Sequence, residues 1–408
     1  MYVKGKNMKI VQINCVYGTA STGRIVKGIE ECARASGLEC IAAYSQGTAD
    51  DREAFRFGSI AEQKVHALLS RLTGLQGYFS YFGTRELLKK LDNMKPDVVH
   101  LHNLHSNNIN LKMLLHYLAK HNITTILTLH DCWFFTGKCC HFTMAGCEGW
   151  KTGCNNCPNL KEDNKSLFFD RSGKMQRDKQ KWFANIPHLF VVGVSEWVTE
   201  LAKESAVLSG AEKFQVIHNG IDLEAFQPRD SDLRQKLGLE GQFIALGLAM
   251  GMSRRKGSYD FFKMAEMLPE GVTLVLAGLT QEQIKSLPGN ITGINRTNDV
   301  TQLSKVYSMA DVFLNPSYED TFGLVNAEAL ACGTPVITYR TGGCTEIVDE
   351  TCGIVVECGD TLAMLAAVEH MKEEIFPAAA CRKRAQMFAQ QERYHDYVTL
   401  YQETVGDK

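Results

Sequence analysis

The sequence predicts an α/β protein with two domains, and three observations support this prediction. The chain has 408 residues, which is more than one ordinary hydrophobic core accommodates. Short apolar runs rich in β-branched residues alternate with helical patterns over most of its length. These runs are continuously apolar, as expected for strands buried on both faces of a parallel sheet. Helices between them complete the strand–helix–strand units of α/β domains.

The predicted strands form two series, one for each domain. The first series comprises residues 10–15, 98–102, 124–129, 189–194 and 215–218. The second comprises residues 243–248, 273–277, 312–315, 335–339 and 354–357. Between them, residues 223–242 are polar and charged and contain a proline, which favours an interdomain linker with a short helix. We therefore predict an N-terminal domain at 8–225 and a C-terminal domain at 240–385.

The last segment, residues 386–408, is predicted to form a helix. Its apolar side chains recur at helical spacing, at Tyr394, Tyr397, Val398, Tyr401 and Val405. A helix with one apolar face needs a domain surface to pack against.

Composition excludes several function classes and indicates a cytoplasmic location. The formal net charge is −2, so no basic surplus predicts nucleic-acid binding. No apolar run approaches the roughly 20 residues that a membrane-spanning helix needs. The first ten residues lack the apolar core of a signal peptide, and we expect the protein in the cytoplasm. Most of the 14 cysteines lie scattered in apolar segments, where a reduced cysteine is a small hydrophobic residue.

A cysteine-rich segment, residues 136–158, is the exception. Cys154 and Cys157 have the spacing of a metal knuckle, and Cys147 precedes them. Either Cys139 or Cys140 completes a set of four. Four thiolates form a closed tetrahedral site, which suits structural zinc and leaves no open position for catalysis. Disulfides or free thiols are the alternative.

Three loops of the N-terminal half follow predicted strands and carry glycine or polar residues. In the first, Gly18 and Gly23 allow a ligand to approach the backbone, although an ordinary strand–helix turn explains them equally well. In the second, the histidines of residues 100–108 fit a polar lip on a substrate cleft better than a metal site. In the third, Asp131 is placed to orient the imidazole of His130, and a purely structural histidine is the alternative.

Two segments of the C-terminal half have the chemistry of a sugar-nucleotide site. The loop at 249–262 contains Arg254, Arg255 and Lys256, which either form a solvated basic loop or bind a diphosphate. The segment 319–348 combines acidic residues, a Phe-Gly turn, a helix start, Glu328 and a Gly-Gly loop. Amides at a helix N-terminus bind phosphate, and a carboxylate farther along can bind a ribose diol. Alternatively, an acidic residue could stand near the helix N-terminus only because the helix dipole favours negative charge there, but this explains one carboxylate and not the whole segment.

The segment 319–348 resembles the donor-binding segment of retaining glycosyltransferases of family 4. The resemblance covers nearly the whole chain: it is strongest over residues 256–348, moderate at residues 219–222 and at His130, and weak at Gly23 in the glycine loop. The resemblance implies the GT-B arrangement, in which two Rossmann-like domains face each other across a cleft. The C-terminal domain would hold the nucleotide and the N-terminal domain the acceptor, and the helix at 386–408 would return to the N-terminal domain.

The resemblance also implies roles for single residues of the donor site. Glu328 would bind the ribose hydroxyls and Asp320 the sugar, with Glu319 as the alternative first acid because the family has glutamate there. Lys256 would bind phosphate. The family's arginine six residues earlier is Met250 here, so Arg254 or Arg255 would supply the second cation. Backbone amides and the glycine loop would complete the site through Phe322, Gly323, Leu324, Gly23 and Arg24.

Further roles follow for the remaining motifs. His130 matches a family histidine that lines the reaction centre, and it joins Lys256 and Asp320 as a predicted catalytic residue. Asn219 and Asp222 belong to a motif that marks the hinge between the domains. A subset of bacterial polysaccharide transferases has a similar cysteine-rich insertion, which implies zinc ligands at Cys139, Cys147, Cys154 and Cys157.

The implied reaction moves a hexose-type sugar from a nucleoside diphosphate to a hydroxyl of a glycan, with retention of the anomeric configuration. We expect a lipid-linked acceptor in cell-surface polysaccharide biosynthesis, peripheral contact with the inner membrane, and catalysis without a cofactor or divalent metal. Two alternatives belong to other classes: a sugar-nucleotide epimerase on the same fold, and a non-enzymatic zinc-knuckle adaptor. An epimerase would change the donor in the absence of any acceptor, and the lack of a basic surplus disfavours a nucleic-acid adaptor.

Overall fold

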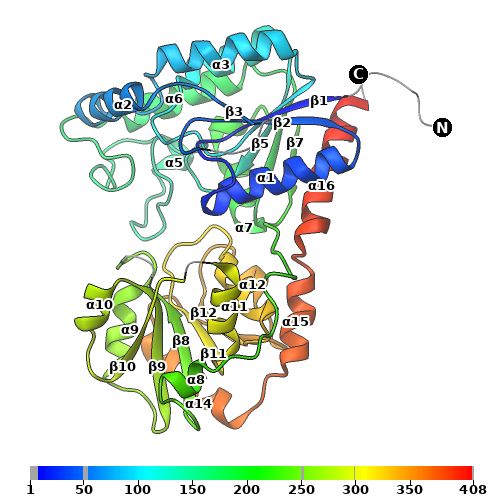
Figure 1. Cartoon of the computed structure of the whole chain (residues 1–408). Helices are drawn as coiled ribbons and strands as arrows, with labels where there is room; N and C mark the ends of the chain where they lie inside the picture. The colour runs from blue at the N-terminus through cyan, green and yellow to red at the C-terminus, as the bar shows by residue number, and fades with distance from the viewer. Residues whose placement is uncertain (1–7, 49–53, 250–251, 298, 407–408) are drawn as a thin grey trace. The chain divides into compact units, whose positions relative to one another are not determined.

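The computed structural model describes residues 8–48, 54–249, 252–297 and 299–406 (Figure 1). The chain divides into two compact units. Unit 1 contains the residues up to His218 together with those from Gln391 onward, and unit 2 contains Asn219–Gln390. Each unit is an α/β domain around one parallel sheet, which confirms the predicted fold class.

Unit 1 is built on a seven-stranded sheet in which every strand pair is parallel. Its order is β3-β2-β1-β4-β5-β6-β7. The strands are β1 (Lys9–Ile13), β2 (Glu39–Tyr44), β3 (Phe55–Arg56), β4 (Val98–Leu101), β5 (Thr124–Leu129), β6 (Leu189–Gly193) and β7 (Lys213–Val216). The chain proceeds outward from β1 to β3 and then returns to place β4 beside β1. Ligands of open parallel sheets bind beyond the carboxyl ends of strands at such a reversal.

Helices connect these strands along the chain. They are α1 (Ala20–Ala35), α2 (Ile60–Thr73), α3 (Tyr81–Met94), α4 (Leu111–Lys120), α5 (Gly149–Thr152), α6 (Ser172–Phe183), α7 (Glu196–Glu204) and the 3₁₀ helix η1 (Ala206–Leu208). Ser195 caps α7 by accepting a hydrogen bond from the Val198 amide. Helix α6 contributes to the core of unit 1, because it buries Met175 and Lys179.

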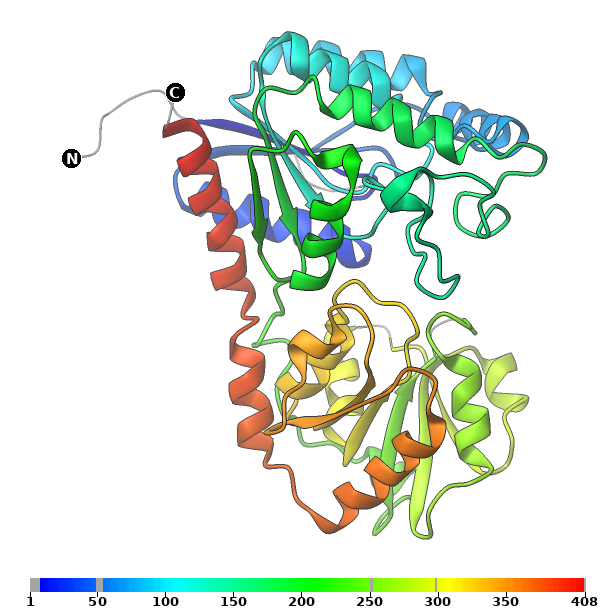
Figure 2. The ribbon, with the colours of Figure 1, turned by 180° about the vertical axis from the view of Figure 1, so that it is seen from behind.

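The final helix, α16 (Gln390–Gly406), returns to unit 1 as predicted (Figures 1 and 2). Its side chains Tyr394, Tyr397, Val398, Leu400 and Tyr401 join one core cluster with residues of α1, β1, β4, β5 and β6. The contact with α1 is close, since a Cβ added to Gly28 would lie 2.2 Å from the ring of Tyr394. Unit 1 is therefore assembled from both ends of the described chain.

Unit 2 has a six-stranded parallel sheet of the order β10-β9-β8-β11-β12-β13. The strands are β8 (Phe243–Leu248), β9 (Val272–Leu279), β10 (Ile291–Asn295), β11 (Val312–Asn315), β12 (Val336–Tyr339) and β13 (Gly353–Val356). The helices are α8 (Leu233–Lys236), α9 (Ser258–Ala265), α10 (Gln281–Lys285), α11 (Val300–Ser308), α12 (Leu324–Ala331), α13 (Cys344–Ile347), α14 (Thr361–Glu373) and α15 (Ala378–Gln386). The direction of winding reverses between β8 and β11, so a ligand site is expected at their carboxyl ends.

Within the described ranges, no helix is long and apolar enough to cross a membrane.

Candidate functional site

The loops that follow β8 and β11 meet at the reversal point of unit 2. The Lys256 ammonium lies 2.5 Å from the Asp320 carboxylate, and the two side chains are 37% and 18% exposed. The amide of Tyr318 donates to the carbonyl of Arg255 at 2.8 Å, which joins the loop backbones directly. The structure thus brings a predicted cation and a predicted acid into contact, although 64 residues separate them in sequence.

A glycine makes this close approach geometrically feasible. Gly257 has φ +67°, and a Cβ added there would lie 1.9 Å from the carbonyl oxygen of Pro316. Any other residue would therefore clash with the loop after β11 and be strained in the left-handed region. The resemblance to the family rests on Lys256 followed by Gly257, but the packing requirement on the glycine is visible only in three dimensions.

The loop after β12 holds Asp320 from its other side. The amide of Gly343 donates to the carbonyl of Asp320 at 3.3 Å, and a Cβ on Gly342 would lie 1.7 Å from that oxygen. The Thr341 hydroxyl donates to the carbonyl of Tyr318 at 2.8 Å. Three loops, after β8, β11 and β12, therefore fix the position of the acid.

Helix α12 begins at the same point. Gly323, with φ +86°, precedes its first residue, Leu324, so the first amides of an eight-residue helix start beside Asp320. Phe322 is buried against Phe388 with ring centroids 5.6 Å apart. Glu319 is also buried, at 7% exposure. The helix start is thus rigidly packed, as binding an anion with backbone amides requires.

Glu328 lies farther along α12 and is half-buried. Its Oε2 accepts a hydrogen bond from the hydroxyl of Tyr307 at 2.9 Å. Tyr307 is fully buried on α11, and burial followed by the nearby Glu328 carboxylate raises the pKa of its hydroxyl well above the usual value. The tyrosine therefore remains protonated and acts as a permanent donor that orients the carboxylate.

A second carboxylate, Asp260, supports the site and was missed by sequence analysis. It is 3% exposed on α9 and accepts from the hydroxyls of Tyr318 (2.8 Å) and Tyr339 (2.9 Å). Burial, and then hydrogen bonding to Asp260, raises the pKa of Tyr318 to about 12. The spacing of the three residues in sequence gives no hint of this network, because each comes from a different element.

The remaining predicted donor residues are placed less tightly. Arg254 is exposed and Arg255 is half-buried, both in the loop that carries Lys256. Met250 lies outside the described residues. In unit 1, Arg24 is exposed on α1, whereas Gly23 is buried and packs on its own loop, since the Gly18 amide donates to its carbonyl at 2.9 Å.

The predicted hinge motif begins where unit 2 begins, at Asn219. Asp222 closes a turn by accepting from the amides of Glu224 and Ala225, each at 3.0 Å. Ile221 forms a bridge with Ala389, so the two chain segments that leave unit 2 are paired there.

His100 in β4 and His102 just after it do not form a polar lip, and for these two histidines the prediction was wrong. His100 and His102 are fully buried. His100 bonds to the hydroxyls of Tyr401 and Thr128, both at 2.7 Å, which ties α16 to the sheet. The sequence pattern was misleading because these polar side chains satisfy one another inside the core.

His130 and Asp131 follow β5 as predicted, but Asp131 does not orient the His130 ring. The partner of His130 is His102, with Nε2 and Nδ1 3.0 Å apart. Asp131 instead lies 2.8 Å from Nε2 of His105. The interaction with His105 lowers the pKa of Asp131 to about 2 against the opposing effect of burial.

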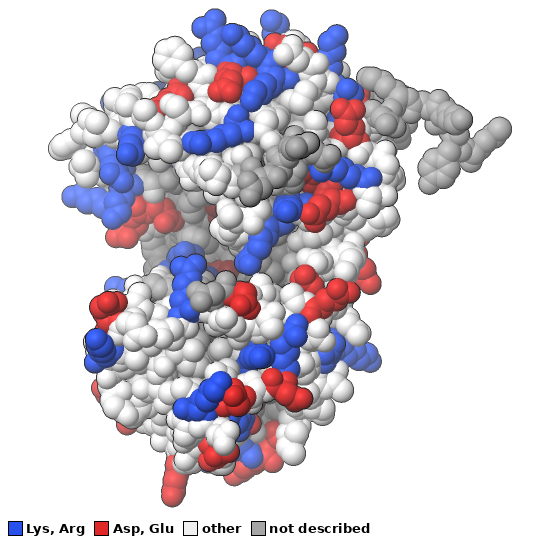
Figure 3. Space-filling view, in the orientation of Figure 1, with Lys and Arg blue, Asp and Glu red and all other residues white. Residues whose placement is uncertain are grey.

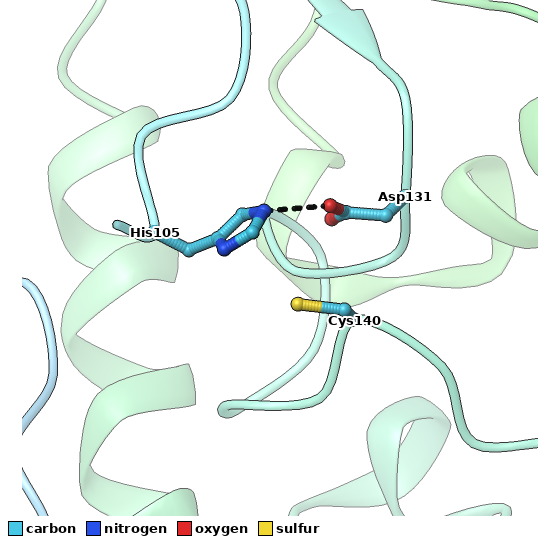
Figure 4. A group of neighbouring side chains, drawn as sticks. All are labelled: His105, Asp131 and Cys140. Carbon is cyan, nitrogen blue, oxygen red and sulfur yellow. Dashed lines mark ion pairs between the residues drawn. The ribbon is translucent and has the colours of Figure 1, made fainter. Parts of the chain in front are cut away.

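His105, Asp131 and Cys140 form a compact group in which the three ligand atoms lie within 4.8 Å of one another (Figure 4). Among the described residues, no other group of three histidine, cysteine or acidic side chains has its ligand atoms this close together. Burial lowers the pKa of the His105 imidazole, but nearby Cys140 and then Asp131, its ion-pair partner, raise it well above its usual value. The group thus contains an ion pair, and its residue types and spacing could also hold a metal ion.

The cysteine-rich insertion surrounds a small cavity of about 20 Å³. Four cysteines line it, and they are the predicted set of Cys139, Cys147, Cys154 and Cys157. Cys140 does not line it, so the structure assigns the two adjacent cysteines to different groups. The sulfur atoms of these four cysteines are spaced more widely than the ligand atoms of the His105 group, since no three of them lie within 4.8 Å of one another.

Comparison with known proteins agrees with this geometry. The family model described as Glycosyltransferase Family 4 matches residues 31–225, and that described as Glycosyl transferases group 1 matches residues 243–374. Together the two models span both units. The chain belongs to glycosyltransferase family 4.

Relatives of this glycosyltransferase include a protein provisionally named as the colanic acid biosynthesis glycosyl transferase WcaC, from Escherichia coli K12. It is 28% identical over 320 residues, which are 75% of this chain and 76% of that protein. A D-inositol 3-phosphate glycosyltransferase of Xylanimonas cellulosilytica is 32% identical over 185 residues, which are 40% of this chain and 44% of that enzyme.

Solved structures show the same GT-B fold. Sucrose-phosphate synthase from Thermosynechococcus elongatus has a TM-score of 0.72 at 18% identity, covering 98% of this chain and 100% of that chain. Anabaena HepE, solved with UDP and glucose, has a TM-score of 0.64 at 16% identity, covering 97% and 100%.

Proposed function

We propose that this glycosyltransferase transfers a hexose-type sugar from a nucleoside diphosphate to a glycan hydroxyl with retention of configuration. The contact between Lys256 and Asp320 at the start of α12 carries this proposal. It gathers a cation for the diphosphate, an acid for the sugar hydroxyls and helix amides for a phosphate at the reversal point of one sheet. Glu328, held by Tyr307 on the same helix, would bind the ribose.

In the proposed reaction, the bond between the anomeric carbon and the diphosphate breaks on the face where the acceptor attacks. Lys256, a neighbouring arginine and the amides of α12 stabilise the negative charge that develops on the diphosphate. The leaving diphosphate takes the proton of the acceptor hydroxyl as the new glycosidic bond forms. Without a donor, Asp320 neutralises Lys256, and a bound diphosphate would compete for that ammonium. These steps assign no role to a divalent metal ion.

The experiment is a thermal-shift screen of nucleotide sugars on the wild type, Lys256→Ala, Glu328→Ala and Lys285→Ala. One class of nucleotide sugar should raise the melting temperature of the wild type and of Lys285→Ala, an exposed lysine on α10. The shift should be lost in the other two variants. Shifts of equal size in all four proteins would contradict the proposed site.

The same screen separates a transferase from an epimerase. A transferase should leave the sugar of the bound donor unchanged in the absence of an acceptor, apart from slow hydrolysis. Chromatography of the incubated donor would detect its epimer, and formation of the epimer would favour the epimerase.

We propose that the acceptor is a lipid-linked glycan of cell-surface polysaccharide biosynthesis and that unit 1 contacts an anionic membrane surface. Large apolar side chains are exposed on α2, at the start of α3 and before α6. They are Ile60, Val65, Leu68, Tyr81, Phe82, Leu167, Phe168 and Phe169. The three sets are neighbours: the Leu167 amide donates to the Arg71 carbonyl at 2.8 Å, and the Phe82 amide donates to Glu62 at 2.8 Å.

Basic residues accompany this apolar surface. Lys64 and Arg71 share the exposed face of α2 with Ile60 and Leu68. Lysine and arginine side chains also gather over α3 (Figure 3). Two grooves of about 560 and 430 Å³ beside Met113 add further cations, contributed by Lys112, Lys174, Arg85, Lys89 and Lys120. Apolar insertion combined with attraction to acidic headgroups is how peripheral proteins bind bilayers.

Vesicle sedimentation tests this surface. The wild type should bind vesicles that contain phosphatidylglycerol, bind phosphatidylcholine vesicles weakly, and dissociate at high salt. The double variant Phe82→Ser/Phe168→Ser should bind less. Leu362→Ser is the control, because Leu362 is also a highly exposed apolar residue, at 65%, but lies on α14 of unit 2. Equal binding by both variants would contradict the proposal.

We also propose that the cysteine insertion binds structural zinc through Cys139, Cys147, Cys154 and Cys157. The four thiols line one cavity. The pKa of Cys157 is lowered to about 7, mainly by its hydrogen bond with Cys139 and further by nearby Lys138. Zinc binding would draw the four sulfur atoms closer together.

Metal analysis tests this assignment. Purified protein should contain one zinc ion per chain by mass spectrometry of metals, and Cys154→Ser should lose it, whereas Cys358→Ser should retain it. Metal-free wild type would refute the assignment.

A further inference from the structure

Three polar side chains that belong to or follow three adjacent strands form a hydrogen-bonded chain in unit 1, and its outer member, His130, is partly exposed. Gln12 lies in β1, His102 follows β4 and His130 follows β5, and these strands are neighbours in the sheet. His102 lies 3.0 Å from Gln12 through Nε2 and 3.0 Å from His130 through Nδ1. Gln12 and His102 are fully buried. Buried groups of this kind must match each donor with an acceptor.

The direction of every hydrogen bond in this chain can be deduced from its inner end. The Gln12 amide nitrogen donates to the carbonyl of Val26 at 3.0 Å, so its oxygen faces His102. That oxygen only accepts, so His102 carries its proton on Nε2. A neutral His102 then has a bare Nδ1, which accepts from Nε2–H of His130.

The reverse arrangement would place a proton on both nitrogens of His102. It would create an imidazolium inside the core, with the His100 ring centroid only 4.0 Å away. Burial lowers the pKa of His102 well below its usual value, and neighbouring His100 and His130 lower it further. The neutral chain is therefore strongly favoured.

We propose that Gln12 and His102 are positioning residues that hold His130 as the neutral Nε2–H tautomer, with its Nδ1 lone pair available to a ligand. Nδ1 of His130 has no hydrogen-bond partner among the residues that the structure describes. A bare nitrogen only accepts hydrogen bonds. A ligand at this atom must therefore present a donor, such as a sugar hydroxyl, and a carboxylate is disfavoured.

The charged and titratable groups around His130 are compatible with this neutral form. His102 and His100 are neutral and buried, and Asp131 is paired with His105. Burial lowers the pKa of His130 to about 4, which outweighs the opposing effect of the Asp131 carboxylate. His130 should therefore remain uncharged at neutral pH.

Nitrogen NMR of the protein labelled with ¹⁵N-histidine tests the tautomer without reference to activity. At pH 7, the signals of His130, assigned with His130→Gln, should show one protonated nitrogen, Nε2, and one bare nitrogen, Nδ1. His102→Leu removes the acceptor, and the two nitrogens should then give averaged shifts of a tautomer mixture. A protonated Nδ1 or a charged ring in the wild type would overturn the proposal.

Kinetics test the consequence, which rests on the proposed transferase function. His102→Leu should lower kcat about tenfold, the value of one hydrogen bond, while KM for the donor changes less. Nucleotide sugars bearing a neutral hydroxymethyl group should be used in preference to the corresponding uronic acids. Unchanged kcat in a variant whose His130 has lost its single tautomer would contradict the positioning role. Failure of every donor to bind would instead contradict the proposed function and leave the NMR result standing.

Discussion

At the scale of single residues, the donor site depends on carboxylates whose orientation is set by buried tyrosines. Tyr307 directs Glu328, while Tyr318 and Tyr339 are held by Asp260. A buried tyrosine with a raised pKa remains a donor over the whole physiological range, so these contacts do not change with pH.

Replacing Tyr307 with phenylalanine isolates this effect. The ring would still pack against Phe226 and Phe313, whose centroids lie 6.3 and 5.3 Å away. Only the hydrogen bond to Glu328 would be lost, at a cost of about 1 kcal/mol in donor binding. Calorimetric titration with the nucleotide sugar should show affinity lowered about fivefold. A large loss of stability with unchanged affinity would show that the bond serves the fold alone.

Residue chemistry explains which parts of the site could be predicted from sequence. Lys256, Asp320 and Glu328 belong to compact motifs, and their side-chain types fit phosphate, sugar and ribose. Asp260 was not predicted, because an isolated aspartate within a helix has no distinctive spacing. The partner of Asp131 was wrongly predicted because neighbours in sequence are not always partners in space, and the loop containing His105 reaches it instead.

At the scale of elements, helix α2 is anchored by a histidine that must stay neutral. His66 is fully buried, and its Nε2 accepts from the Gly77 amide at 3.1 Å, so Nδ1 donates to the Ser80 hydroxyl at 2.7 Å. Burial lowers the pKa of His66 to about 4. A second proton on the ring would sit on Nε2 and point at the N–H of Gly77, so this hydrogen bond would be lost.

This anchor predicts a loss of stability in acid. His66 takes up its proton near pH 6.5 in the unfolded chain but only near pH 4 in the folded chain. The contribution of neutral His66 to the free energy of unfolding is therefore complete above about pH 6.5 and falls as the pH drops toward 4. At pH 5, the loss is about 2 kcal/mol. Urea unfolding at pH 7 and pH 5 should show a smaller difference for His66→Gln than for the wild type. Identical pH dependence would disprove the assignment.

The loop after β8 gives a second prediction at this scale. Gly257→Ala should lower the free energy of unfolding of unit 2 by more than 2 kcal/mol and abolish donor binding, because the new methyl group would displace the loop after β11. Gly241→Ala is the control. Gly241 has a similar φ of +75° but no neighbour within 4 Å, so only the backbone strain of about 1 kcal/mol applies. Chemical denaturation measures both, and equal losses would argue against the clash.

Elements also differ in how well the sequence specified them. The strands at 124–129, 243–248 and 312–315 were predicted with their observed ends, because apolar and β-branched residues dominate each run. Strands β2, β3 and β10 were not predicted. β3 is only two residues long, and β10 contains a glycine and lies at a sheet edge, where burial is incomplete.

At the scale of the whole molecule, the division into two units follows the two strand series of the sequence. What the sequence pattern did not specify is the depth to which α16 enters unit 1. Tyr397 and Tyr401 bond to Thr128 and His100 in the middle of the sheet. Helical spacing predicts an apolar face, but it does not identify the strands that the face covers.

Deleting the residues after Gln390 tests this dependence. Unit 1 would lose five buried side chains of α16, each worth roughly 2 kcal/mol, and one of the two hydroxyl partners of His100. Limited proteolysis should then degrade unit 1 rapidly and leave a resistant fragment close to Asn219–Gln390. Equal resistance of both units would contradict the prediction.

This arrangement has a consequence for biosynthesis. A ribosome releases residues 8–218 long before it has polymerised 391–406, so the first unit emerges with its hydrophobic centre incomplete. The second unit has all of its strands in one uninterrupted stretch and can fold while translation continues. Chains that terminate before residue 391 should therefore be prone to aggregation, and chaperones would be expected to associate with the nascent chain until α16 is made.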